Sequence, residues 1–513
     1  MSLSSPYRLL NNTAWNIIGR FIAVGVSIGL TSYLVANLGT ERFGLWALAN
    51  LLVGYFSLAD LGIQASLVRQ IAFARPDENP EQLSKIVSTS FFVFFGAFVV
   101  AAPAALVLVP MFEGLMPVGE LAAEALLVVQ VAIGSVFLSI AFAVLNSILP
   151  GVQRMDLSNQ IGAMGSLTLL GGSVIAIESG WGVPGVLLAS IAAKILQGWA
   201  SYLVARGLFP QFRLLERHVD REVWKELFSF GWKIQVSRLC ELGTFTFDRL
   251  FLSVAAGVGA LGLYQPAVQV ATQARMLPFL AIQALLPYTS ELSAAGQKDK
   301  LRRIYFEGSL YLSFATFALL GFLIAFAPWL TLAWLGEDFE SEKVALWIRI
   351  FCLGYLFNVP LSLAGIVSQA IGRPGIQARS SLMGTGLNVI LAPLGFWYAG
   401  VTGLTVGATM AVVLPSLWFA WALHRAIGVT NIEFQKKSVV APLAHWFPAV
   451  VVGLAATSQF GPTERSAAFA FAGAAGLVWA GYGWMAAKRL ELFDVRARLE
   501  ALDSSDSEFR HSD

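Results

Sequence analysis

Long apolar stretches recur along the whole sequence, and short polar segments separate them. Each stretch runs roughly 18–26 residues, which is enough for a helix rising about 1.5 Å per residue to cross a hydrocarbon core of ~30 Å. Hydrophobic residues make up 57% of the chain and charged residues only 13%, whereas soluble domains have roughly 45–50% and ~25%. The sequence therefore predicts an all-α integral membrane protein without a soluble domain of any size.

The apolar stretches predict about fourteen transmembrane helices, and twelve is the alternative count. The expected spans are residues 13–37, 43–66, 86–111, 123–149, 157–177, 183–207, 229–255, 260–288, 304–332, 343–370, 377–398, 400–424, 440–458 and 466–487. They predict an N-terminal six-helix bundle, a linker, a second six-helix bundle, two additional helices and a tail. The boundaries of these five parts are 1–207, 208–228, 229–424, 425–487 and 488–513.

The distribution of lysine and arginine predicts the orientation of the chain in the membrane. If the N-terminus lies in the cytoplasm, the outward loops hold only Arg42, Lys343 and Arg465, whereas the inward loops hold many more cations, including clusters at 206–225 and 298–303. This asymmetry is the positive-inside pattern. Both termini are therefore expected in the cytoplasm.

The longest expected inward loop, 208–228, places apolar residues such as Phe212 and Trp224 between arginines at near-helical spacing. This pattern predicts a cytoplasmic amphipathic helix in the membrane interface. Such a helix serves either as a connector between the bundles or as a lipid-binding element. The tail after Lys488 predicts a short surface helix followed by a frayed end.

The first half of the chain resembles the second at an offset of 218 residues. The shift superposes Arg20 on Arg238, Gly39 on Gly257, Gly44-Leu45-Trp46 on Gly262-Leu263-Tyr264, and Gly182-Val183-Pro184-Gly185 on Gly400-Val401-Thr402-Gly403. Because the repeat unit contains six helices, an even number, both copies enter the membrane in the same direction. We therefore expect a pseudo-twofold axis along the membrane normal and a cavity between the two bundles.

Segments near the N-terminus carry a likeness to a known family. They are Leu38-Gly39-Thr40-Glu41-Arg42-Phe43-Gly44-Leu45-Trp46, Tyr55-Phe56-Ser57-Leu58-Ala59-Asp60-Leu61-Gly62 and Ser66-Leu67-Val68-Arg69. With its two bundles and terminal helix pair, the chain resembles the polysaccharide biosynthesis exporters. These are Wzx-type lipid-linked oligosaccharide flippases of the multidrug/oligosaccharidyl-lipid/polysaccharide (MOP) superfamily.

The resemblance implies a function and a location. The substrate would be an undecaprenyl-diphosphate-linked glycan, such as an O-antigen or exopolysaccharide repeat unit. Alternating access would carry it from the inner to the outer leaflet of the bacterial inner membrane. The implied protein partners are a glycan polymerase and a chain-length regulator.

Several ionisable residues lie inside the expected spans, where each would cost ~2.5–3.5 kcal/mol at the bilayer centre. They are Arg20, Asp60, Lys194, Arg238, Glu241, Asp248, Arg249 and Arg275. Such groups must be paired, lie near an interface or line water. The span 229–255 is the most charged, because about 100° per residue places its two arginines and two acidic residues near one helical face.

The predicted substrate-binding residues are Arg20, Arg238, Arg249 and Arg275. A guanidinium stays charged when partly buried and can bind phosphate oxygens through two hydrogen bonds, which suits a lipid diphosphate. The alternative role is structural, with an Arg238–Glu241 ion pair one turn apart and bridges from the other charges to neighbouring helices. The residues expected either to pair with basic groups or to couple transport to an ion are Asp60, Glu241 and Asp248.

No catalytic motif is present, since the sequence has no phosphate-binding loop, no His-Glu-x-x-His and no nucleophile elbow. We therefore predict no enzyme activity, no cofactor, no metal and no nucleic-acid partner. Transport would draw on an ion gradient, on the membrane potential or on removal of the product. Two alternatives stay open: a cation-coupled multidrug exporter of the same superfamily, and a membrane glycan polymerase or ligase. The exporter would favour a more acidic or apolar cavity, and the enzyme usually carries a long periplasmic loop.

Overall fold

The computed structural model describes residues 6–60, 62–74, 79–108, 121–282, 286–337, 339–461, 464–490 and 492. Almost all of these residues are helical, and no strand occurs among them. Within these ranges nine helices are long and apolar enough to cross a membrane, or ten if the bent pair Ala122–Gly134 and Val136–Gly151 is one span. The predicted all-α membrane fold is therefore confirmed, and the count of fourteen stays a prediction.

Contacts divide the chain into two compact units, residues 1–242 with 249–265 and residues 243–248 with 266–513. The helices of unit 1 are α1 (Pro6–Phe56), η1 (Ser57–Asp60), α2 (Ile63–Ala74), α3 (Pro80–Leu108), α4 (Ala122–Gly134), α5 (Val136–Asn146), α6 (Ile148–Gly151), α7 (Met155–Glu178), α8 (Gly182–Leu208) and η4 (Glu216–His218). Those of unit 2 are α11 (Leu286–Ala294), α12 (Lys298–Leu335), α13 (Ser341–Asn358), η6 (Val359–Leu361), α14 (Ser362–Ala370), α15 (Pro374–Ile427), α16 (Asn431–Phe434), the π-helix η7 (Gln435–Val439), α17 (Val440–Gln459) and α18 (Arg465–Arg489). Two further helices, α9 (Arg221–Ala255) and α10 (Gly257–Ile282), contribute residues to both units. The predicted part boundaries stay a prediction.

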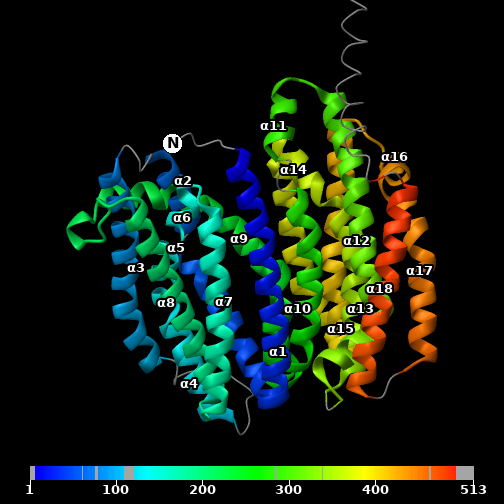
Figure 1. Cartoon of the computed structure of the whole chain (residues 1–513), viewed down its shortest axis with the longest axis horizontal. Helices are drawn as coiled ribbons and strands as arrows, with labels where there is room; N and C mark the ends of the chain where they lie inside the picture. The colour runs from blue at the N-terminus through cyan, green and yellow to red at the C-terminus, as the bar shows by residue number, and fades with distance from the viewer. Residues whose placement is uncertain are drawn as a thin grey trace, which may run out of the picture. The chain divides into compact units, whose positions relative to one another are not determined.

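In unit 2, the long helix α12 packs against α13, α17 and α18 (Figure 1). Side chains of the terminal pair, α17 and α18, fix it to α12. The Trp479 indole stacks on Trp446 with ring centroids 5.0 Å apart, and its Nε1–H donates to the Ala318 carbonyl at 2.9 Å. The two helices that lie outside the sequence repeat are therefore anchored by directional bonds as well as by apolar packing.

Glycines break two of the longest helices. Gly39 in α1 has φ 73° and Gly400 in α15 has φ 59°, conformations that glycine adopts without strain. Each of these helices therefore covers two of the spans predicted from the sequence. The repeat counterparts Gly257 and Gly182 have φ 82° and 56°. The 218-residue offset thus pairs glycines that all have a positive φ, both at Gly39 with Gly257 and at Gly182 with Gly400.

The predicted amphipathic helix over 208–228 is wrong. Residues 209–220 form an irregular connection with one short 3-10 turn, and α9 begins only at Arg221. Hydroxyl groups of α3 satisfy the backbone of this connection: Ser88 accepts from Leu215 N–H at 3.2 Å and Thr89 from Asp220 N–H at 2.9 Å. Phe212 is fully buried in an apolar core of unit 1. Phe212, one of the apolar residues that suggested a membrane-surface helix, is therefore covered by protein.

The predicted tail helix lies almost entirely outside the described residues, which after α18 include only 490 and 492.

Candidate functional site

A polar cluster forms where α1 ends. The chain leaves α1 at Phe56, passes through η1 and turns at Gly62, whose φ is 72°. The backbone N–H of Gly62 donates to Oδ1 of Asp60 at 2.8 Å. A Cβ atom at Gly62 would overlap the backbone oxygen of Gly231 in α9. The turn therefore needs glycine both for its positive φ and for the close approach of α9.

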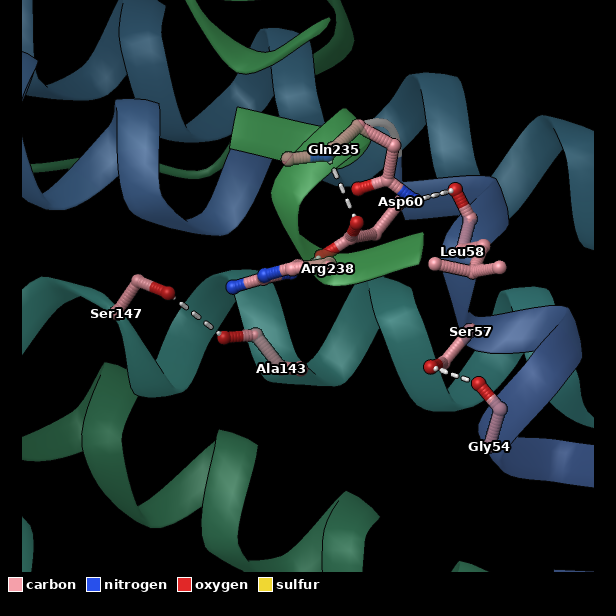
Figure 2. Close-up of polar contacts among 9 residues, drawn as sticks. Gly54, Ser57, Leu58, Asp60, Ala143, Ser147, Gln235 and Arg238 are labelled. Carbon is pink, nitrogen blue, oxygen red and sulfur yellow. Dashed lines mark hydrogen bonds and ion pairs between the residues drawn. The ribbon is translucent and has the colours of Figure 1, made fainter. Parts of the chain in front are cut away.

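One face of α9 contacts this turn. Gly231, Gln235 and Arg238 follow one another at helical spacing and so share that face. The Gln235 Nε2–H donates to the Leu58 carbonyl at 2.6 Å, and the Arg238 Nη1–H donates to Oδ2 of Asp60 at 2.9 Å (Figure 2). α9 thus supplies donors both to the backbone and to the carboxylate of the turn.

The Asp60–Arg238 pair is asymmetric in its burial. The Asp60 side chain is 3% exposed and the Arg238 side chain 40% exposed. A buried carboxylate is costly unless it is paired and hydrogen-bonded, and Asp60 has both a guanidinium and a backbone N–H. The Arg238 side chain is partly accessible, and its guanidinium carries further N–H donors besides the one that bonds Asp60.

The pair also corrects one structural interpretation of the sequence. Among the described residues the carboxylate bonded to Arg238 is Asp60, whereas Glu241, the expected partner one turn along α9, is exposed. The alternative in which Arg238 pairs with Glu241 is therefore wrong. For Asp60, pairing with a basic group, one of its two predicted roles, is observed.

Arg275 occupies a different environment, inside unit 2. Its Cζ lies 4.0 Å from the ring centroid of Phe245 in α9 and 5.6 Å from that of Tyr355 in α13. Aromatic rings attract the face of a guanidinium and leave its N–H donors pointing outward in the plane. In the described part of the chain no carboxylate lies within ion-pair distance of Arg275. The rings therefore hold this cation without neutralising it.

The other predicted site residues are placed as follows. Arg20 in α1 and Arg249 in α9 are half-buried and belong to unit 1, and Asp248 in α9 is buried and belongs to unit 2. The structure thus joins Arg238 to Asp60. The shared role of the four arginines in substrate binding stays a prediction. No group of three or more histidine, cysteine, aspartate or glutamate side chains that could hold a metal occurs in the described ranges.

Sequence reasoning missed one intramembrane cation, Arg349 of α13. Its Nε–H donates to the Ile324 carbonyl of α12 at 2.8 Å. Pro328 lies four residues after Ile324 and lacks the N–H that would bond this carbonyl within the helix. The guanidinium therefore replaces a hydrogen bond that the proline removed. The available signal was a proline inside one apolar span and an arginine inside the next.

Relatives among known proteins share most of the chain. A protein of Shigella flexneri named "Putative O-antigen transporter" is 24% identical over 432 residues, which are 82% of this chain and 99% of that protein. A protein of Haloferax volcanii named "Probable flippase AglR" is 22% identical over 413 residues, or 78% of this chain and 80% of that protein. The names of both relatives refer to transport.

Solved structures share the fold. The lipid II flippase MurJ in its inward closed conformation has a TM-score of 0.68 at 13% identity, over 93% of this chain and 99% of that one. An inward-facing multidrug resistance MATE family transporter of the MOP superfamily has a TM-score of 0.62 at 17% identity, over 81% and 96%. The fold is therefore that of MOP-type transporters.

Two family models match the sequence. The model named MatE matches residues 234–394. The model named polysaccharide biosynthesis protein matches residues 9–293, more than half of the chain. This chain therefore belongs to the polysaccharide biosynthesis protein family, and its fold is that of the MOP-type membrane transporters.

Proposed function

We propose that this protein is a flippase for a lipid-linked glycan. The substrate is an undecaprenyl-diphosphate-linked oligosaccharide, an O-antigen or exopolysaccharide repeat unit, moved from the inner to the outer leaflet of the bacterial inner membrane by alternating access. Family membership and the transport names of the relatives support this proposal. The protein acts as a transporter without catalysing a covalent step.

The observation that carries the proposal is the setting of Arg275. A cation within an apolar helix is costly, and the rings of Phe245 and Tyr355 reduce that cost through the guanidinium face. The in-plane donors keep the fork geometry that matches two phosphate oxygens. Two aromatic rings of this kind suit a diphosphate that binds and leaves, because no carboxylate among the described residues pairs with Arg275.

The remaining predicted arginines extend the same role. We propose that Arg20, Arg238 and Arg249 also contact the diphosphate during its passage, with Arg238 oriented by Asp60. The acidic residues Glu241 and Asp248 are the proposed sites for ion coupling. A glycan polymerase and a chain-length regulator are the proposed partners, and both termini are proposed to lie in the cytoplasm.

Export assays in a flippase-deficient strain test the role of Arg275. We expect Arg275→Ala to reduce glycan export at least tenfold at unchanged membrane abundance. Arg275→Lys should recover part of the export, because a point charge cannot reproduce the bidentate fork. Arg379→Ala removes an exposed arginine of α15 and serves as the matched control. Full export by a stable chain lacking all four predicted arginines would contradict the proposal.

A multidrug exporter is the second candidate, because the MatE model matches residues 234–394 and a MATE transporter shares the fold. The two candidate functions predict different results for glycan export and for drug tolerance. The flippase restores glycan export to the deficient strain and leaves drug tolerance unchanged. The exporter raises the tolerance of a hypersensitive strain and does not restore export.

A further inference from the structure

We propose that α10 contains a hinge at Gly262–Pro266, about which its two segments change their angle during transport. The proposal rests on the proposed transport function, since a transporter must change conformation. Three observations carry it: the locking of the first segment into unit 1, the anchoring of the second segment in unit 2, and the interrupted backbone hydrogen bonding between them.

The first segment of α10 is locked against α1 by two glycines. A Cβ atom at Gly44 would overlap the carbonyl oxygen of Val258, and one at Gly262 would overlap that of Thr40. The two contacts are reciprocal, because the 218-residue offset carries Thr40 to Val258 and Gly44 to Gly262. The crossing therefore lies where the two copies of the repeat meet.

Apolar packing completes the lock. Val258 and Leu261 belong to one buried core with Leu45 and Leu48 of α1 and Val183 of α8. Backbone contact at both glycines leaves no room for α10 to slide along α1. The segment before residue 266 therefore behaves as part of unit 1.

The second segment is anchored elsewhere. The division between the two units falls between Gln265 and Pro266. Further along α10, Arg275 lies against the rings of Phe245 and Tyr355, which both belong to unit 2. One helix is thus held at its start by unit 1 and later by unit 2.

Pro266 interrupts the hydrogen bonding at the division itself. It has no N–H for the carbonyl four residues earlier, which belongs to Gly262, and a proline ring inside a helix crowds the carbonyl at that position. Sharp changes of helix direction concentrate at such prolines. α9 also contributes residues to both units, but its segment 243–248 contains no proline. Bending is therefore expected in α10, and it would move Arg275 relative to the lock at Gly262.

Spin-label distance measurements on the purified full chain test the hinge without any glycan. One label replaces Val219, which is 46% exposed in unit 1, and the other replaces Gln297, which is exposed in unit 2. Both native cysteines are first changed to alanine. We expect the parent chain in lipid nanodiscs to show two distance populations. Pro266→Ala, which restores the missing N–H, should remove one of them.

Matched variants separate hinge flexibility from other effects. Pro278→Ala restores an N–H in the same helix but within unit 2, so it should leave both populations unchanged. Pro266→Gly restores the N–H but keeps the backbone flexible, so both populations should remain. These two variants also provide the readout if Pro266→Ala fails to fold, because loss of a population in either one would contradict the hinge.

The outcomes are distinct from those of the export assay. A single narrow distance in the parent chain, or identical distributions in the parent and Pro266→Ala, would overturn the hinge even if export is normal. Conversely, a chain that exports no glycan can still show the two populations and their loss in Pro266→Ala. In that case the result supports the hinge and contradicts the proposed substrate.

Discussion

Removing the guanidinium of Arg238 should destabilise the fold more than removing the charge of Asp60. Breaking a buried pair costs about 3–5 kcal/mol when one charge is left unpaired. In Arg238→Ala the charge left without its partner is Asp60, whose side chain is 3% exposed and whose remaining donor, among the residues that the structure describes, is the Gly62 N–H. Solvent already screens the pair, because the Arg238 side chain is 40% exposed. We therefore expect a loss of about 2–3 kcal/mol.

Neutralising Asp60 instead of Arg238 should lower the free energy of unfolding by a smaller amount. In Asp60→Asn the amide oxygen can still accept from Gly62, and the stranded cation is the partly exposed Arg238, which water can reach. The expected loss is about 1 kcal/mol. The double variant Asp60→Asn, Arg238→Ala should recover at least about 1 kcal/mol relative to the sum of the two single losses.

Equilibrium unfolding in mixed micelles, run on the parent and all three variants, measures this coupling. Glu241→Ala is the matched control, because Glu241 is exposed on the same helix, and its effect should stay within about 0.5 kcal/mol. Strictly additive losses, or equal losses for the two single variants, would refute the reasoning from burial.

Two further outcomes are expected. Arg349→Met should destabilise by about 1–2 kcal/mol in the same assay, because the Ile324 carbonyl loses its donor. In a Pro328→Ala background, where the helix regains its own N–H, that loss should shrink below about 0.5 kcal/mol, and an unchanged loss would contradict the replacement. Alkaline phosphatase fused after Glu337 should be active and after Lys298 inactive, as the lysine and arginine asymmetry predicts; the reverse pattern would overturn the orientation.

Sequence periodicity and composition determined the class of the protein. Apolar stretches long enough to span a bilayer force the backbone into helices, because hydrocarbon offers no other hydrogen-bond partners. The repeat offset was also visible, and it identified Gly39 with Gly257 and Gly44 with Gly262 before their backbone roles were known. These features depend on neighbouring residues or on a fixed repeat, so they can be read from the amino-acid sequence alone.

Only the tertiary structure decided which groups pair. Asp60 and Arg238 lie 178 residues apart in sequence, and helical spacing pointed instead to Glu241. Residues 208–228 are a second case. Their near-helical spacing indicated an apolar face, but it could not show that Phe212 would be buried by protein rather than by lipid. Arg349 is a third case, because its acceptor is a backbone carbonyl freed by a proline in another helix. A sequence pattern reports that a group needs a partner, and only the packing of distant segments determines which partner it meets.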